Sequence, residues 1–343
     1  MELRRHFPQL IVFAFSWVAA AKNLRNNWPS RHWQKARLPG GRHFFTSFPM
    51  NKFFATLVLA GTSYLGAPWW RAALGPVTTV VDYQDLVAAE RAFSEFTSQH
   101  GIRAGFTRFL AEEAVVVTNR RFQPGKPTYE KVPEQPTVLS WQPVYADIAA
   151  SGDFGYTTGP FEVRPRATEA AAAFGQYTSI WRKTSTGEWK VVADVGISYP
   201  APSVRPQMVE LLPATALPAR AAVAADTATR RQELLNAEQA LDKVAATQSQ
   251  QAAYRLVLST TQAVRLYRAG SLPYIGPTAT AFIATQTQPA TYTPLHAVVA
   301  ASGDLGFTYG YGEIEHKKGP FLRIWRRGAN QPWELVHEVL DVQ

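Results

Sequence analysis

The chain of 343 residues contains no cysteine, and this absence excludes several kinds of chemistry. A disulfide framework, a thiol nucleophile and a thiolate metal site all require cysteine. The sequence also lacks a His-Glu-x-x-His motif, a glycine-rich phosphate loop and a Gly-x-Ser-x-Gly elbow. The histidines after residue 67 are too scattered along the sequence to indicate a metal site: His100, His296, His316 and His337. We therefore expect no metal and no cofactor.

Acidic residues are scarce at the start of the chain, and the basic excess is confined to that region. The formal net charge is +9, yet residues 1–49 hold eight Lys or Arg residues against the single acid Glu2. From Pro68 onward the chain has 26 basic and 25 acidic residues. A nearly neutral body lacks the positive surface that holds a phosphate backbone. The charge distribution predicts no nucleic-acid partner.

Long hydrophobic runs are also missing. The apolar run from Phe53 to Ala60 is shorter than the roughly 18 residues of a membrane-spanning helix. It follows Lys52 and precedes small residues up to Ala67, which is the pattern of a secretory signal peptide. We predict a signal peptide at residues 50–67, no stable membrane span, and a periplasmic or secreted location.

The segment before Met50 does not fit this pattern. A second apolar run, Leu10 to Ala21, follows Arg4 and Arg5, and the residues after it have neither a helical nor a strand period. We interpret Met50 as the start of translation, with residues 1–49 as a non-native or disordered leader. The alternative is a genuine basic leader.

An internal repeat organises the rest of the chain. Residues 150–159, with the sequence Ala-Ser-Gly-Asp-Phe-Gly-Tyr-Thr-Thr-Gly, return at 301–310 with seven of ten residues identical. The triplet Ile-Trp-Arg and a Trp-x-x-Val segment follow in the same order in both copies. Repetition at this distance predicts two tandem domains, at 84–199 and 226–343. The prolines and alanines of residues 200–225 predict a semi-rigid linker between them.

Each copy has helical periodicity first and strands afterwards. Residues 85–99 place apolar side chains at helical spacing, and a shorter helix around Phe106 follows. Residues 120–135 are expected to form a loop or an irregular insert because they are rich in proline and glycine. A second-copy helix is expected near Asp226 and another at Pro277, because proline is favoured in a first turn. Strands are predicted at 114–118, 144–151, 154–163, 174–183 and 188–198, with counterparts in the second copy. This order predicts an α+β fold.

Three motifs carry a resemblance to a known fold. They are Gly-Asp-x-Gly-Tyr-Thr-x-Gly at 152–159, Tyr-x-x-x-Trp-Arg-Lys at 177–183, and Gly-x-Trp-Lys-Val-Val-x-Asp at 187–194. These motifs resemble the nuclear-transport-factor-2-like superfamily, the fold of ketosteroid isomerase and SnoaL-like proteins, and in particular a bacterial domain family of unknown function within it. The resemblance implies two cone-shaped α+β domains, each with N-terminal helices on a curved antiparallel sheet around a mostly apolar pocket. It implies little about activity, because one fold hosts many functions.

Two acids at equivalent positions are the candidate catalytic residues. Asp194 lies near the end of the last strand of the first copy, and Glu338 aligns with it in the second. The pocket of ketosteroid isomerase uses an aspartate as its base. Strict strand alternation would place Asp194 on the same face as Lys190 and Val192. The alternative is an acid that faces solvent or pairs with Arg182.

Other polar residues near these strands have more ordinary interpretations. His337 should face away from Glu338, so the two should not form a dyad. Asp153 and Asp304 follow a glycine, where aspartate serves local turn chemistry. Glu112 and Glu113 are expected at the end of the second helix.

Aromatic side chains alternate along the predicted strands and are the candidate ligand-binding residues. The alternative is that they form the core, and the change from Tyr156 to Phe307 between the copies fits this alternative. The candidates are Trp141, Tyr145, Tyr177, Trp181, Tyr292, His296, Tyr309 and Trp325.

Three functional hypotheses follow from these residues. The leading one is an exported protein that binds a small, partly apolar organic molecule. The second is an acid/base enzyme of the isomerase or dehydratase type with a pocket carboxylate as base. The third is an interaction scaffold, in which the two domains pair within the chain or in a homodimer.

Overall fold

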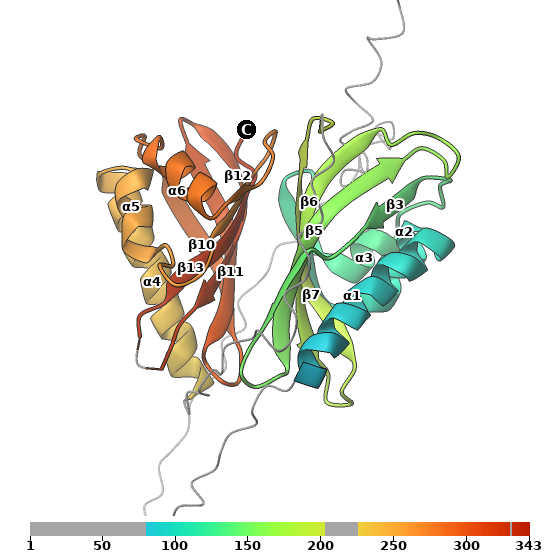
Figure 1. Ribbon diagram of the computed structural model, residues 1–343, viewed down its shortest axis with the longest axis horizontal. Helices are drawn as coiled ribbons and strands as arrows, with labels where there is room; N and C mark the ends of the chain where they lie inside the picture. The colour runs from blue at the N-terminus through green and yellow to red at the C-terminus, as the bar shows by residue number, and fades with distance from the viewer. Residues whose placement is uncertain (1–79, 203–225, 330) are drawn as a thin grey trace, which may run out of the picture. The chain divides into compact units, whose positions relative to one another are not determined.

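A computed structural model describes residues 80–202, 226–329 and 331–343, all of which belong to one compact unit (Figure 1). The predicted leader and signal peptide, and all but the first residues of the predicted linker, lie outside the described residues. No helix within the described ranges is long and apolar enough to cross a membrane.

The first domain has three helices and a seven-stranded sheet. Its strands follow the spatial order β2-β1-β7-β6-β5-β3, and β4 also pairs with β5. All neighbours are antiparallel except β1 and β7, which run parallel. The elements are α1 (Val80–His100), α2 (Ile102–Phe109), β1 (Leu110–Thr118), β2 (Arg121–Pro124), α3 (Gly125–Glu130), β3 (Val138–Trp141), β4 (Tyr145–Ile148), β5 (Phe154–Arg164), β6 (Ala173–Lys183) and β7 (Trp189–Tyr199).

The second domain repeats this plan with a six-stranded sheet in the order β10-β11-β12-β13-β8-β9, in which β13 and β8 are parallel. Its first helix begins as predicted, because the carboxylate of Asp226 accepts bonds from the backbone N–H groups of Ala228 and Thr229. The elements are α4 (Thr227–Thr247), α5 (Gln250–Val257), β8 (Arg265–Arg268), β9 (Tyr274–Ile275), α6 (Pro277–Ala284), β10 (Thr291–Val299), β11 (Leu305–Ile314), β12 (Lys317–Arg326) and β13 (Glu334–Leu340). The predicted α+β fold with two domains is confirmed.

Two local predictions in the first domain were wrong. Residues 120–135 are not simply a loop, because they contain β2 and α3, and the proline of α3 lies in its first turn, where no helical N–H bond is lost. Glu112 and Glu113 do not end a helix. The backbone of Leu110 is already extended, so both acids lie in β1 and are exposed.

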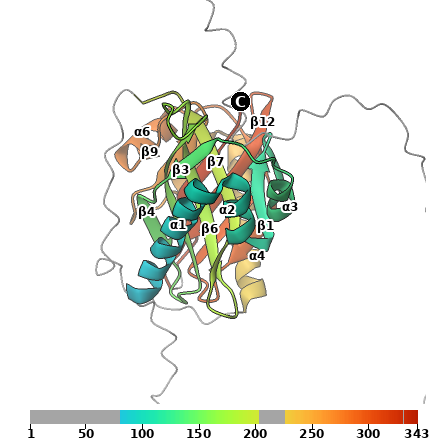
Figure 2. The same cartoon turned by 90° about the vertical axis from the view of Figure 1, so that its right-hand side faces the viewer.

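The helices of each domain cover one face of its sheet. Helices α1 and α2 lie across the first sheet (Figure 2), and α4 and α5 lie against the second (Figure 1). Leu86 on α1 and Leu234 on α4 are fully buried at these contacts. A Cβ added at Gly155 would lie 2.7 Å from the Leu86 side chain, and one at Gly306 would lie 2.8 Å from that of Leu234. The repeated glycine therefore lets each helix approach its sheet.

The faces of the two sheets that are not covered by helices share a hydrophobic core, separate from the core under the helices of each domain. The rings of Phe154 and Phe307 stack with their centroids 6.0 Å apart, and the Tyr156 ring stacks on His337 at 5.8 Å. Both faces of each central strand are thus buried, which explains why the burial along these strands does not alternate between buried and exposed residues. Tyr156 and Phe307 belong to this core.

The repeated hairpin turns contact each other. The hydroxyl oxygens of Ser151 and Ser302 lie 3.0 Å apart, and the carboxylate of Asp304 accepts a bond of 3.2 Å from the N–H of Ala150. Arg326 joins Asp304 to Asp147 of the first domain through charged hydrogen bonds. Asp304 therefore links the two domains, beyond the local turn chemistry that the sequence indicated. The positive φ of each turn belongs to the preceding glycine.

Candidate functional site

A β-bulge in the last strand of each domain determines which side chains face the helices. In the first sheet Ile180 pairs with Ala193 and Trp181 with Val191, so Val192 is an extra residue. Val191 therefore packs in the core under the helices, whereas Val192 and Ala193 pack against the second domain. The prediction that Asp194 shares a face with Val192 was wrong, because a bulge breaks the alternation of period two.

Because of this bulge, the Asp194 side chain lies in the space between the helices and the sheet of the first domain, called here the first cone. Asp194 is 5% exposed as a residue, and its carboxylate accepts a hydrogen bond of 2.7 Å from the Ser179 hydroxyl. Burial raises the pKa of Asp194 to about 7, and the nearby acid Glu90 adds to this increase. The alternative partner Arg182 pairs instead with Glu113 on β1. Asp194 is thus a buried carboxylate that changes protonation state near neutral pH.

A small cavity adjoins Asp194. Its volume of about 10 Å³, measured as the space open to the centre of a water molecule, is close to that of a single water. The hydroxyl of Tyr177, which lines the cavity, has no hydrogen-bond partner within the described part of the chain, and burial raises its pKa well above the usual range. The cavity is lined by Phe106, Leu139, Trp141, Phe161, Tyr177 and Asp194.

A second buried acid, Glu90 on α1, lies in the same cone. It is fully buried and accepts bonds from the indole N–H groups of Trp141 and Trp181 and from the Thr157 hydroxyl. Burial raises the pKa of Glu90, and these hydrogen bonds offset part of the increase. The sequence analysis missed this residue. The signal was there, because Glu90 lies four residues after Leu86, on the apolar face of the helix.

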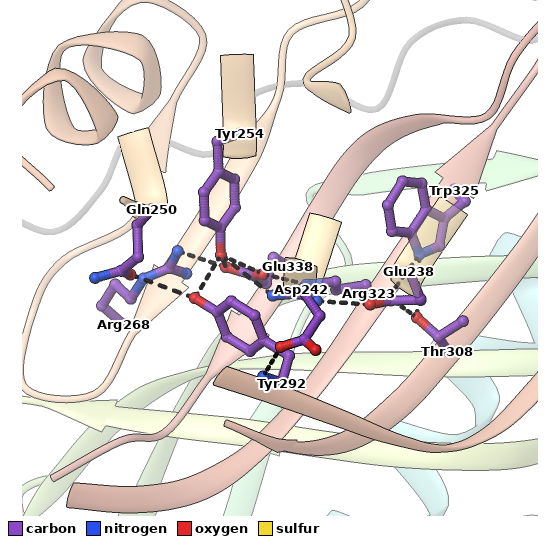
Figure 3. Close-up of polar contacts among 10 residues, drawn as sticks. All are labelled: Glu238, Asp242, Gln250, Tyr254, Arg268, Tyr292, Thr308, Arg323, Trp325 and Glu338. Carbon is purple, nitrogen blue, oxygen red and sulfur yellow. Dashed lines mark hydrogen bonds and ion pairs between the residues drawn. The ribbon is translucent and has the colours of Figure 1, made fainter. Parts of the chain in front are cut away.

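The space between the helices and the sheet of the second domain, called here the second cone, contains a network of buried ion pairs (Figure 3). Arg323 on β12 is fully buried and binds Glu238 on α4 at 2.7 Å. Its Nε donates to Glu338, which also binds Arg268. The hydroxyl of Tyr254 completes the set with a bond to Glu338 of 2.6 Å. Each of the four charged groups named here, Arg323, Arg268, Glu238 and Glu338, therefore has an opposite charge beside it.

This network gives Glu338 the opposite electrostatics from Asp194. Burial raises the pKa of Glu338, but Arg268 and Arg323 more than offset that effect and lower it to about 2. Glu338 is therefore an ionised ion-pair partner at neutral pH. A base must be able to take up a proton near the working pH, and Glu338 is poorly suited to that role.

Aromatic rings surround the Arg323 guanidinium. Its central carbon lies 4.0 Å from the ring centroid of Tyr292, 4.4 Å from that of Phe321 and 5.9 Å from that of Tyr254. These distances fall within the range of cation–π attraction. The guanidinium thus occupies the space between the helices and the sheet.

The strand registers show which residues of the two cones correspond. Thr157 lies opposite Ser179, which lies opposite Asp194. In the second domain Thr308 lies opposite Arg323, which lies opposite Glu338. The place of Arg323 is therefore held by Ser179 in the first domain.

The remaining predicted site residues divide between two environments. Trp181 and Trp325 lie in the cones, where their indole N–H groups donate to Glu90 and Glu238. Three others lie on the face that packs against the other domain. Tyr145 lies under the Arg265 guanidinium at 3.3 Å, Tyr309 packs on Phe122 at 4.6 Å, and the His296 ring lies 5.8 Å from Tyr309. The structure does not bring these three into a cone.

His337 lies on the opposite face from Glu338, as the sequence analysis predicted. Its Nε2 lies 2.8 Å from the hydroxyl oxygen of Thr178 in the first domain. Burial and the neighbouring Arg265 lower the pKa of His337 to about 3, so the ring is neutral at pH 7. His337 is part of the contact between the domains, and it forms no dyad with Glu338.

No protein-family model matches this chain, and no curated protein matches it. Among solved structures, 71 chains match, and each match described here covers about a third of this chain. A ketosteroid isomerase-like protein from Erwinia carotovora atroseptica is 18% identical over 35% of this chain and 98% of its own, with a TM-score of 0.30. An NTF2-like protein of unknown function from Pseudomonas putida is 16% identical over 37% of this chain and 92% of its own, also with a TM-score of 0.30.

A protein of unknown function with a cystatin-like fold from Nostoc punctiforme is 13% identical over 36% of this chain and 96% of its own, with a TM-score of 0.30. These proteins are of the kind that the sequence motifs indicated. At such identities and TM-scores the likeness says nothing about what this chain binds or converts.

Proposed function

We propose that the first domain binds a small, partly apolar organic molecule in its cone, with Asp194 as the polar group that recognises it. The observation that carries this proposal is the cavity beside a buried carboxylate whose pKa is raised to about 7. In this proposal the second domain, whose cone is filled by Arg323, is a structural partner for the first.

The chemistry of the cavity supports this function. Its walls are aromatic and aliphatic, and Asp194 is the only charged residue among the described residues that line it. Ligand sites are typically mostly apolar with a few placed polar groups. A molecule larger than water needs more room than about 10 Å³. Binding therefore requires that some of the side chains lining the cavity move aside.

A second candidate function is acid/base catalysis at the same residue. A pKa near the working pH is what a general base requires, and Asp194 meets that condition. Perturbed pKa values cluster at functional sites, although structural acids also show them. Turnover of a bound ligand that Asp194→Asn abolishes without loss of binding would favour the enzyme.

The experiment is ligand-observed saturation-transfer NMR on the full chain at pH 7, with phenol and cyclohexanone as neutral probes. We expect binding by the parent protein and at least a tenfold weaker affinity in Asp194→Asn, which keeps the size of the side chain. Glu112→Gln is the matched control, because the Glu112 side chain is 84% exposed and does not line the cavity. Equal binding by all three proteins would contradict the role of Asp194. Absence of any ligand would favour the scaffold hypothesis.

We also propose that residues 50–67 direct export and that the mature chain begins near Pro68. Support comes from the order of basic, apolar and small residues in that segment. The test is the mass of the protein purified from its own host. A mature mass that still includes residues 50–67 would contradict this proposal.

A further inference from the structure

The content of the second cone indicates a ligand class for the first. Arg323 presents a planar organic cation to two buried carboxylates, those of Glu238 and Glu338. Three aromatic rings lie within 4.0 to 5.9 Å of its guanidinium carbon. Carboxylates and aromatic faces together are the groups that bind organic cations in proteins. The second cone is therefore a complete cation site that the chain fills with its own side chain.

The first cone keeps the acidic walls of this site. Glu90 corresponds to Glu238, because each accepts bonds from the tryptophan of the Ile-Trp-Arg triplet and from the threonine of the repeated motif. Asp194 corresponds to Glu338 by strand register. Both carboxylates of the cation site are thus present in the first domain.

The aromatic walls also correspond. Tyr177 lies opposite the last glycine of the first motif, and Phe321 lies opposite that of the second. Trp141 and Tyr292 make T-shaped contacts with these two rings. Phe106 and Tyr254 occupy the same place in α2 and α5, because in each helix the carbonyl of this residue accepts the C-cap N–H.

The first cone differs in lacking the cation. Ser179 replaces Arg323, and the cavity opens beside Asp194. Among the residues that the structure describes, no lysine or arginine acts on the Glu90 or Asp194 carboxylate. A carboxylate buried without a counter-ion is costly, and a bound cation would supply one of the two positive charges that Arg323 and Arg268 supply in the second cone.

We propose that the ligand of the first cone is a small organic cation, a guanidinium with a short apolar group, which takes the place that the Arg323 guanidinium holds in the second cone. This inference deepens the proposed function and rests on it, since it names the chemical class of the molecule that the first cone binds.

The pH dependence of binding follows from the groups that face Asp194. These are Glu90 from α1, Tyr129 from α3, and Tyr177 and Ser179 from β6, none of which is basic. A cation favours the ionised carboxylate, so a ligand that binds below the pKa must displace a proton. We expect affinity for a cation to increase about tenfold from pH 6 to pH 8. A neutral ligand would not show an increase of this sign.

The experiment is titration calorimetry of the full chain with methylguanidinium, compared with methylurea as its neutral isostere and with phenol and cyclohexanone. We expect the parent to bind methylguanidinium at least tenfold more tightly than methylurea. Ser179→Arg should abolish this binding, because the new side chain would supply the cation in place of the ligand. Asp194→Asn should weaken it at least tenfold, and Glu112→Gln should leave it unchanged.

A variant of the other domain provides an independent readout. Arg323→Ser removes the built-in cation from the second cone, and methylguanidinium should raise its melting temperature more than methylurea does. Three results would overturn the inference. If phenol or cyclohexanone binds through Asp194 and methylguanidinium does not, the ligand class is wrong but the proposed function stands. If none of the four probes binds, both fail. If Asp194→Asn binds methylguanidinium as well as the parent, the cation binds elsewhere.

Discussion

The two cones of this protein have matching walls and opposite electrostatics. Each contains two buried acids and a ring of aromatic side chains, yet Asp194 has a pKa raised to about 7 and Glu338 one lowered to about 2. Two changes account for this difference. Ser179 of β6 stands where the second domain has Arg323 of β12, and the second cone also contains Arg268. A single fold can therefore carry a protonatable acid or a fixed ion pair at the same position.

The comparison also indicates that the two cones should respond differently when one of their residues is changed. A buried ion network stabilises little relative to apolar packing, but removal of one partner leaves charge uncompensated in a medium that solvates it poorly. The second domain is therefore expected to tolerate changes in its cone badly. In the first domain no cation is paired with the two acids among the described residues, and each accepts hydrogen bonds from neutral donors.

The largest expected effect comes from breaking the network of the second cone. Arg323→Ser, which copies the first domain, leaves Glu238 and Glu338 buried without their shared cation. We expect a loss of about 3–5 kcal/mol in the free energy of unfolding at pH 7, measured with urea. Lys318→Ser on the same strand is the control, since its side chain is 73% exposed and its ion pair should contribute about 1 kcal/mol or less. Similar losses in both variants would contradict the importance of the network.

A comparable effect should appear in the pH dependence of stability, with opposite signs for the two acids. Asp194 has a folded pKa of about 7 against a model value of 3.8, so its stabilising contribution is complete below about pH 4 and is lost as pH rises to about 7. Over about three pH units this amounts to at most about 4 kcal/mol. Asp194→Asn should lack this loss when its unfolding free energy is measured from pH 4 to pH 8.

Glu338 provides the contrast when the same measurement on the parent is extended down to pH 2. Its folded pKa of about 2 lies below its usual 4.5, so its contribution is present above about pH 4.5 and is lost as pH falls toward 2. Unfolding free energies of Asp194→Asn and the parent that run parallel from pH 4 to pH 8 would show that the acid is not buried in solution.

A smaller effect is expected where the two domains meet. Arg326 binds Asp147 and Asp304 and is buried, whereas Arg182, at the equivalent place in the first domain, has a side chain that is 46% exposed. Hydrogen bonds to charged groups contribute about 1.5–3 kcal/mol, so Arg326→Ala should lower the unfolding free energy by that amount. Arg182→Ala should cost about 1 kcal/mol or less. Equal costs in urea unfolding would contradict this asymmetry.

The smallest expected effect concerns Tyr177, an aromatic side chain of the first cone. Tyr177→Phe gives the first cone the residue that the second has as Phe321, and it removes a buried hydroxyl without a partner among the described residues. Because no hydrogen bond is lost, stability should stay within about 1 kcal/mol of the parent or increase. Thermal unfolding checks this, and a decrease of more than about 2 kcal/mol would mean that the hydroxyl is bonded in solution.

Much of the fold could be predicted because its signals are local. The repeated Gly-Asp turn, the Asp226 cap and the proline that opens α6 each act within a few residues. Residues 120–135 show the limit of such signals. Their prolines and glycine are typical of a loop, but pairing with β1 makes the first part a strand.

The candidate site was harder to predict, because its geometry depends on contacts that are distant in the sequence. Asp194 and Glu338 could be chosen from the repeat, but the bulges that direct them into the cones could not be seen in a regular alternation. The apolar face of the helix could have pointed to Glu90, but the tryptophan and threonine donors that bind Glu90 and Glu238 come from strands distant in the sequence.

The amino-acid sequence was enough for the tandem repeat, the α+β class and the resemblance to a cone-shaped fold, since turns, caps and periodicity are encoded over short stretches. It also contained the exchange of Ser179 for Arg323, which is visible when the two copies are aligned. The meaning of that exchange came from the packing. Arg323 meets a glutamate 85 residues away, and whether an acid is a protonatable group or an ion-pair partner depends on burial and on charges that only the folded chain brings together.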